Sequence, residues 1–82
     1  MEKSLHSEGY SLFLRQLRAA RKSAGITQIE LAERLDETQS FVSKCERGER
    51  RIDVVELLDI AAAIGFDPRE AIKRLKSVSL RA

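Results

Sequence analysis

The sequence has few of the residues that make covalent or metal cross-links. Its 82 residues include one cysteine, Cys45, and one histidine, His6. A single cysteine cannot form a disulfide within the chain, and one Cys with one His cannot hold a metal ion without carboxylates or a second chain. We therefore expect no metal and no cofactor, and a fold that depends on its apolar core.

Long apolar runs are also missing. The longest uninterrupted one covers residues 60–64, and the first ten residues lack the apolar centre of a signal peptide. The sequence thus predicts a cytoplasmic protein without a membrane segment. At this length we expect one domain. It has no phosphate-binding loop, no nucleophile paired with a histidine and no second domain to form a cleft, so neither an enzyme nor a small-molecule ligand is expected.

Proline and glycine are scarce as well, with one Pro and four separate Gly, whereas 43% of the residues are hydrophobic and 34% are charged. This composition is typical of a helix-rich globular domain. A first helix is predicted over residues 11–24, where Phe13, Leu17, Ala20 and Ala24 recur at helical spacing before Gly25.

The next two predicted helices are short and close together. Thr27 and Glu30 have the spacing of a capping box, which starts a second helix that continues to about Leu35. Thr38 is the expected cap of a third helix, which ends at Gly48. Its apolar side is Val42 and Cys45.

Two more helices complete the predicted all-α domain. Asp53 and Glu56 form a second capping box, and Asp67 with Pro68 starts the last helix. For the fourth helix we expect a core stripe that ends before Gly65, made by Leu57, Ala61 and Ile64 and widened by Leu58 and Ile60. The last helix presents Ala71, Ile72, Leu75 and Val78.

The basic residues are unevenly distributed. Residues 11–51 contain nine basic and six acidic side chains, a balance of +3, whereas five of each cancel over residues 52–82. Residues 53–59 hold three acids and no base. A modestly basic side is typical of a surface that meets phosphates, although many solvated helices have similar charge.

The connection between the second and third helices is the most informative stretch. Only Asp36, Glu37 and the cap Thr38 separate them, which forces a sharp crossing and brings the third helix to the surface. With Val42 and Cys45 facing inward, a row of hydrogen-bonding side chains faces outward. This row is Gln39, Ser40, Ser43, Lys44 and Arg47. Taken without the motif, such a row is more typical of an ordinary solvated helix face.

The residues T-Q-I-E-L-A-E-R-L at 27–35 and S-F-V-S-K-C-E-R-G at 40–48 resemble the helix-turn-helix of phage repressors and Cro. The resemblance covers about residues 12–68. It implies a compact five-helix, lambda-repressor-like DNA-binding domain over residues 11–76, with the helix-turn-helix at 27–48. Residues 1–10 and 77–82 are then a flexible N-terminal tail and a C-terminal tail.

The resemblance also implies roles for individual residues at a DNA surface. Base contacts are expected from Gln39, Ser40, Phe41, Ser43 and Lys44. Phosphate contacts are expected from Thr27, Gln28, Arg47, Arg50 and Arg51. Three of these roles remain open. Ser43 is equally a small residue beside the backbone, and Arg50 and Arg51 are equally residues of an exposed loop. Arg21 and Glu46 match a family ion pair that ties the first helix to the third.

Two positions depart from the family pattern. Asp36 stands where the family most often has Gly, and Asp tolerates the left-handed conformation better than most residues, at about 1 kcal/mol of strain. Cys45 replaces a larger apolar residue, which leaves the core underfilled or filled by a neighbour. We interpret Cys45 as a core residue, with a redox switch as the alternative.

The resemblance predicts a sequence-specific transcriptional regulator that binds double-stranded DNA at a palindromic operator as a homodimer. Apolar residues of the last helix either close the core or form the dimer interface. These candidates are Ile72, Leu75, Val78 and Leu80, with Tyr10, Leu12 and Phe13 as an alternative surface. The competing hypothesis is an antitoxin or other protein-interaction module on the same fold, with autoregulatory DNA binding.

Overall fold

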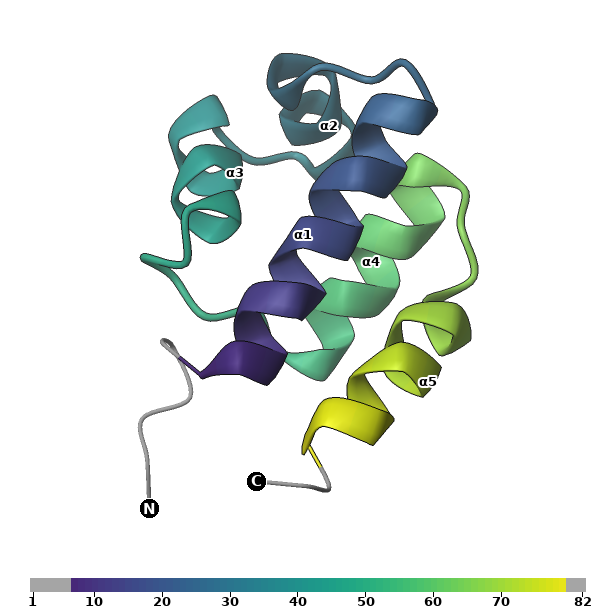
Figure 1. Ribbon diagram of the computed structural model, residues 1–82. Helices are drawn as coiled ribbons and strands as arrows, with labels where there is room; N and C mark the ends of the chain where they lie inside the picture. Colours follow the sequence, from purple (N-terminus) through teal and green to yellow (C-terminus); the bar gives the residue numbers. More distant parts are fainter. Residues whose placement is uncertain (1–6, 80–82) are drawn as a thin grey trace.

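All five described helices begin at a side chain that caps the first turn, and at the last of them Asp67 accepts from the Arg69 N–H at 2.9 Å. Ser7, Thr27, Thr38 and Asp53 each accept a hydrogen bond from the backbone N–H three residues later, at 2.7–3.1 Å. The computed structural model describes residues 7–79, with side chains to residue 76 (Figure 1). Its helices are α1 Glu8–Ser23, α2 Gln28–Leu35, α3 Gln39–Glu46, α4 Val54–Ile64 and α5 Pro68–Ser79. The predicted all-α class is confirmed, with no strand between residues 7 and 79.

Helix α1 begins earlier than the expected Ser11, because Ser7 accepts from the Tyr10 N–H and caps the helix. Gly9 and Tyr10 are buried, and the Tyr10 hydroxyl accepts a hydrogen bond of 3.0 Å from the Ile52 N–H. Residues 8–10 are therefore part of the packed helix. At the other end, the backbone of α5 continues to Ser79, past the expected boundary at residue 76.

The core consists of two neighbouring groups of apolar side chains. One lies among α2, α3 and α4 and includes Leu31, Val42 and Ile60. The other joins α1 to the start of α4 through Phe13, Leu17 and Leu57 and neighbouring side chains. Figure 1 shows α1 running between α3 on one side and α5 on the other. The principal extents are 36 × 23 × 20 Å.

Two residues expected in the core are exposed instead. Ala24 follows the last residue of α1 and lies at the surface, and Leu58 keeps 53% of its area exposed. The buried residues of α4 are Leu57, Ile60, Ala61 and Ile64. Leu58 follows Leu57 by one position, a turn of about 100° around the helix, which carries it off this buried face. The stripe that contacts the core is thus narrower than predicted.

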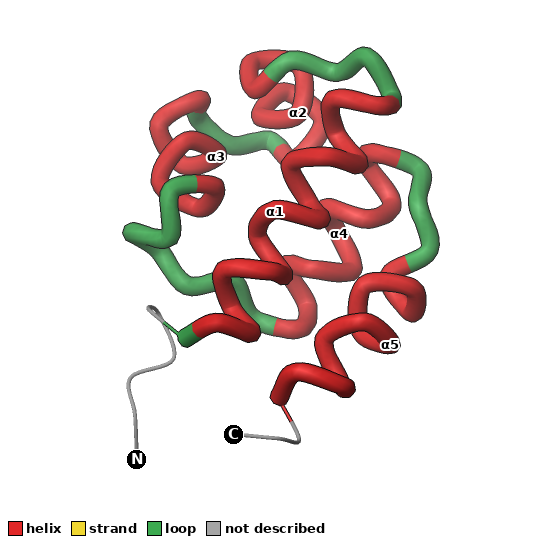
Figure 2. Tube along the Cα trace, viewed as in Figure 1, coloured by secondary structure: helices red, strands yellow, loops and turns green. Residues whose placement is uncertain are grey.

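The loops hold α2 and α3 at a sharp angle (Figure 2). Asp36 ends α2 with φ 57° and ψ 44°, the left-handed conformation expected at this position. Its N–H and that of Glu37 donate to Glu33 and Ala32, which satisfies carbonyls at the end of α2.

Within residues 7–79, the structure contains no helix with the length and apolarity needed to cross a membrane.

Cys45 is buried on the inner side of α3, as predicted. It lines a cavity of about 20 Å³ together with apolar residues of all three neighbouring helices. The core beside Cys45 therefore contains a gap with room for about one water molecule. Burial raises the pKa of the Cys45 thiol, and the nearby charge of Arg50 opposes that effect only in part.

The predicted ion pair between Arg21 and Glu46 joins α1 to α3. The Arg21 Nε and Nη2 atoms donate to the two carboxylate oxygens of Glu46 at 2.6 and 3.0 Å, and Nη1 donates to the Ile26 carbonyl at 2.9 Å. Only 8% and 10% of the two side chains is exposed. A bidentate pair this well shielded fixes both the distance and the rotation of α3 relative to α1.

Removing one member of this pair should destabilise the domain strongly. We expect Arg21→Met, which leaves the Glu46 charge buried and unpaired, to cost about 3–5 kcal/mol of unfolding free energy in urea titrations. The double variant Arg21→Met/Glu46→Leu should recover much of that loss, because no charge stays buried. Arg69→Ala removes an exposed pair with Asp67 and serves as a control that should leave the midpoint unchanged. Additive losses in the double variant would contradict the direct coupling.

The Cys45 thiol should react only when the domain opens. We expect alkylation by iodoacetamide at pH 8 to be at least about 100-fold slower in the native protein than in urea, an opening free energy of about 3 kcal/mol. Burial and the raised pKa both slow the reaction of the folded state. Mass spectrometry of timed samples measures the rate. Fast native labelling would favour the redox-switch hypothesis over a core role.

Candidate nucleic-acid interface

Helix α3 presents a polar outer face that matches most of the predicted row. Gln39, Ser40, Lys44 and Arg47 are exposed, whereas Ser43 is half-buried. Val42 and Cys45 face the core, which fixes the rotation of this eight-residue helix and so points Gln39, Ser40 and Lys44 outward. The exposed face of α3 thus carries amide, hydroxyl and ammonium groups.

A chain of hydrogen bonds connects this face to the buried ion pair. The Gln28 Nε2 donates to Glu46 Oε1 at 2.9 Å, and the Gln28 Oε1 accepts from Gln39 Nε2 at 3.4 Å. A carboxylate can only accept, so the Gln28 amide nitrogen faces Glu46 and its oxygen faces Gln39. This order leaves the Gln39 Oε1 and its second N–H directed away from Gln28. Gln28 keeps one N–H free for the predicted phosphate contact.

Arg47 and Ser43 lie together at the end of α3. The Arg47 guanidinium donates to the Ser43 hydroxyl and, at 2.8 and 3.1 Å, to the carboxylate of Glu49. The hydrogen bonds from Arg47 lower the pKa of Glu49. Because both partners are more than half exposed, this pair can open at little cost and release Arg47 for another anion.

Arg50 differs from its neighbours because several groups hold its side chain. It donates to both carboxylate oxygens of Glu56 at 2.9 and 2.7 Å, and its guanidinium lies 4.7 Å from the centre of the Phe41 ring. The hydrogen bonds from Arg50 lower the pKa of Glu56. Phe41 is half-buried against the core. These two residues thus brace the connection from α3 to α4, a role that their sequence positions did not indicate.

Thr27 and Arg51, the two remaining residues predicted to contact phosphates, differ in how far other groups already hold their side chains. The Thr27 hydroxyl accepts from the Glu30 N–H at 3.1 Å, and the Thr27 N–H donates to the Glu30 carboxylate at 2.8 Å, the predicted capping box. Its hydroxyl is therefore engaged at the start of α2. Arg51 is exposed, and its guanidinium lies 5.0 Å from the centre of the Tyr10 ring.

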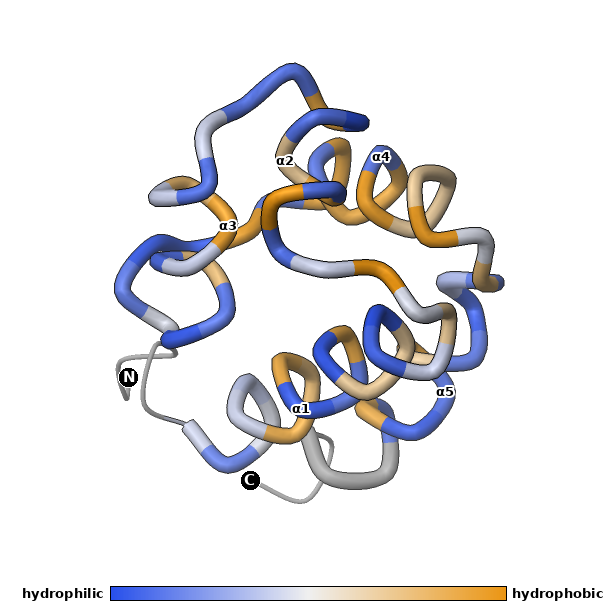
Figure 3. The backbone as a smooth tube through the Cα atoms, turned by 90° about the horizontal axis from the view of Figure 1, so that it is seen from above, coloured by the Kyte–Doolittle hydropathy of each residue, from blue (hydrophilic) through white to orange (hydrophobic). Residues whose placement is uncertain are grey.

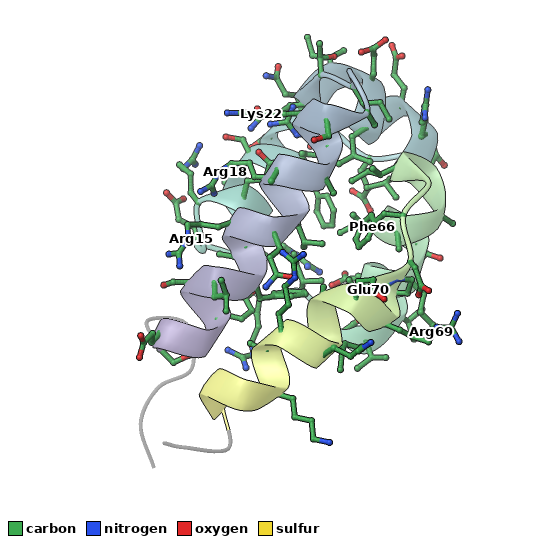
Figure 4. All side chains as sticks on the ribbon, turned by 45° about the vertical axis from the view of Figure 1, so that its right-hand side comes forward. Arg15, Arg18, Lys22, Phe66, Arg69 and Glu70 are labelled. Atoms are coloured by element: carbon green, nitrogen blue, oxygen red, sulfur yellow. The ribbon has the colours of Figure 1, made fainter. Side chains whose placement is uncertain are left out.

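Helix α1 contributes basic residues to this side that the sequence motif did not identify. Arg18 Nη1 donates to the Glu46 carbonyl at 3.0 Å, which satisfies an end carbonyl of α3. Figure 4 shows Arg15, Arg18 and Lys22 along one edge of α1, on the side of α3, while Arg69 and Glu70 lie across the molecule. The position of Arg18 three residues before Arg21 was the available signal, since both then share one helix face.

The candidates for the dimer surface are only partly described. Ile72 is 51% exposed, and Leu75 is half-buried against the core group of α1. The side chain of Val78 and the whole of Leu80 lie outside the described residues. Of the alternative surface, Tyr10 and Phe13 are buried in the core and Leu12 is half-buried. The described side chains thus leave Ile72 as the most exposed of these candidates.

Comparison with known proteins identifies the same motif. A helix-turn-helix family model matches residues 17–70, more than half of the chain. Among curated proteins, the chain is 40% identical over 60 residues to an uncharacterised HTH-type transcriptional regulator, y4dL, of Sinorhizobium fredii. The match covers 73% of this chain and 31% of that protein, so the chain spans about a third of the length of the relative.

Two solved structures with clear sequence similarity share the fold. An XRE-family like protein from Pseudomonas syringae pv. tomato is 47% identical with a TM-score of 0.83, and the match covers 90% of each chain. The restriction-modification controller protein C.AhdI from Aeromonas hydrophila is 34% identical with a TM-score of 0.69, over 76% of this chain and 94% of that one. Together with the capped helices and the polar face of α3, these matches show that the chain belongs to the Cro and phage-repressor (XRE) type of helix-turn-helix family.

Proposed function

We propose that this protein is a sequence-specific DNA-binding transcriptional regulator of the cytoplasm, with α3 in the major groove of a palindromic operator that two copies occupy. The observation that carries the proposal is the polar face of α3, held in one orientation by the ion pair and by Gln28. A major groove about 12 Å wide admits one α-helix, so a rigidly held surface helix with a polar face is suited to it.

The order of donors and acceptors favours Gln39 as the base-reading residue. Its free Oε1 and second N–H form a fork that matches the N6–H donor and N7 acceptor of adenine. Gln28 restrains this fork from one side, so less side-chain entropy is lost on binding. Ser40 and Lys44 are exposed beside it and supply further contacts, with Lys44 suited to guanine or to a phosphate.

The basic side chains around α3 are suited to the DNA backbone. Arg47 follows α3, Arg51 lies in the connection to α4, and Arg15 and Lys22 extend the positive edge along α1. The start of α2 adds the positive end of a helix and the free N–H of Gln28. Arg50 belongs to the bracing of the loop, because Glu56 and Phe41 already hold it.

Selection of bound sequences from random double-stranded DNA tests the proposal directly. We expect an enriched site with two inverted half-sites about one helical turn apart, since two recognition helices about 34 Å apart read adjacent major grooves. The absence of any enriched sequence at low salt would contradict the proposed function. Enrichment of a single, unrepeated half-site would retain DNA binding but contradict the palindromic operator.

Replacement of Gln39 should relax the specificity at one position of each half-site. We expect Gln39→Ala to lose about 1–3 kcal/mol of discrimination against the wrong base pair there, because the fork to adenine is gone. Discrimination at the other positions should be retained. Fluorescence anisotropy with the selected site and its single-base variants measures the change. Equal weakening for all variants would instead place Gln39 outside the base-reading set.

Replacement of Arg47 should weaken binding to every sequence alike. We expect Arg47→Ala to reduce the slope of log K against log salt by about 0.9, the value for one phosphate contact. Arg69→Ala is the matched control, because Arg69 forms a comparable exposed pair with Asp67 but lies across the molecule from α3. Its slope should equal that of the unmodified protein. A sequence-dependent loss for Arg47→Ala would argue for base contact instead.

A further inference from the structure

Helices α1 and α5 leave a groove between them. Figures 1 and 3 both show the two helices side by side. The groove has a volume of about 340 Å³, and its walls come from the second half of α1, the first half of α5 and the connection before α5. Small-molecule sites in proteins have volumes of roughly 300–1,000 Å³, so this groove is large enough for a small ligand.

The two ends of the groove differ chemically, because α5 runs antiparallel to α1 (Figure 1). Gln16 on α1 therefore lies level with Arg74 on α5, whereas Ser23 at the end of α1 lies level with Phe66 before α5. One end thus presents an amide and a guanidinium, and the other an aromatic ring and a hydroxyl. A ligand that is polar at one end and apolar at the other matches this order.

Small side chains line the groove between its two ends. Ala19 and Ala20 belong to the α1 wall, and Ala71 belongs to the α5 wall. Ala71 is buried, whereas Ala19 is exposed at the rim. Gln16 and Ser23 are seven residues apart, which is about 10 Å at the helical rise of about 1.5 Å per residue. The groove therefore suits a narrow molecule of about that length.

The Gln16 amide supplies a hydrogen-bond donor that lacks an acceptor. Its Nε2 atom is buried, and it has no hydrogen-bond partner among the residues that the structure describes. Most buried polar groups in proteins are paired, so an unpaired donor beside a groove indicates a group that a ligand can satisfy. The last torsion of a glutamine side chain is soft, and its rotation brings this N–H to an acceptor in the groove.

The charged groups at the Gln16 end favour an anion. Arg74 lines the groove, and its guanidinium has five N–H donors, enough for a ligand and a protein neighbour together. Arg15, on the edge of α1, adds a second positive charge at the same end. Glu70 lies one turn before Arg74, toward Phe66, where it disfavours a second carboxylate. Two arginines and one glutamate leave the lining with a net charge of +1.

We propose that the groove between α1 and α5 binds a small organic monocarboxylate, whose carboxylate contacts Gln16 and Arg74 and whose apolar tail reaches Phe66. Hydrogen bonds to an ionised carboxylate are about twice as strong as those between neutral groups, so this contact fixes the orientation of the ligand. The site goes beyond the proposed function, because α1 separates it from α3 and it needs no DNA. The sequence did not indicate such a ligand, since the lining comes from helices at opposite ends of the chain.

Titration with 3-phenylpropanoate tests the site in the free protein. This probe carries a carboxylate and a phenyl ring on a short flexible chain. We expect saturable NMR shifts of the amides of Gln16, Ala19 and Ala71, with a Kd on the order of 1 mM for a ligand this small. The uncharged analogue 3-phenylpropanol should bind at least about 5-fold more weakly, because it lacks the ionised acceptor. Glutarate, which has a second carboxylate instead of the ring, should also bind more weakly.

Matched variants test which side chains hold the carboxylate. Arg74→Met and Gln16→Met each remove a donor and keep a helix-forming side chain, and each should weaken binding of 3-phenylpropanoate by at least about 5-fold. Lys73→Met is the control, because Lys73 is an exposed cation one position away from Arg74 and does not line the groove. It should change the Kd by less than about two-fold, since solvent screens an exposed charge outside the site. Ala19→Leu, which puts a larger side chain into the groove, should abolish the shifts.

Other results overturn the inference. The absence of saturable shifts at these residues with about 20 mM probe excludes the site, and shifts confined to α3 place the binding elsewhere. Equal affinity for the acid and the alcohol contradicts recognition of a carboxylate. Equal losses for Arg74→Met and Lys73→Met assign the effect to the general charge of α5. Because no DNA is present, each of these results bears on the groove alone, whether or not the protein binds an operator.

Discussion

The ion pair between Arg21 and Glu46 is the interaction on which the rest of this site depends. Helix α3 has eight residues and buries only Val42 and Cys45, so its own propensity and packing are weak constraints. The bidentate contact with α1 removes the remaining freedom, and Arg18 fixes the end of the same helix through the Glu46 carbonyl. Two arginines of one helix thus determine where the outer face of α3 points.

Glu46 links the buried ion pair to the polar face of α3, because it accepts hydrogen bonds from Arg21 of α1 and from Gln28 of α2. Its Oε1 accepts hydrogen bonds from both Arg21 and Gln28, and the Gln28 Oε1 in turn accepts one from Gln39. Since a carboxylate cannot donate, Glu46 determines that the Gln28 amide nitrogen faces it. The Gln28 amide oxygen then faces Gln39. A buried charge therefore restrains a surface side chain about two hydrogen bonds away. This coupling explains how a short helix can hold a polar side chain ready for a ligand.

The basic residues divide into those that hold the fold and those that remain available to a partner. Arg21 binds Glu46, Arg34 donates to the Ala63 carbonyl at the end of α4, and Arg50 binds Glu56. Lys44, Arg47 and Arg51 stay exposed around α3. The number of basic residues thus overstates how many are available to DNA, because Arg21 and Arg50 are paired with carboxylates inside the domain.

Sequence alone determined the five helices and the helix-turn-helix, because capping side chains such as Thr27 and Asp53 and the inward pair Val42 and Cys45 are local signals. It also indicated the Arg21–Glu46 pair through the family pattern. It did not determine the start of α1, where the Ser7 cap counted for more than the apolar stripe, or the exposure of Leu58. The bracing of Arg50 by Phe41 and Glu56 and the order of Gln28 and Gln39 came only from tertiary structure. These contacts join residues of different helices and loops, and a side chain's partner there depends on how the helices pack rather than on the spacing within one helix.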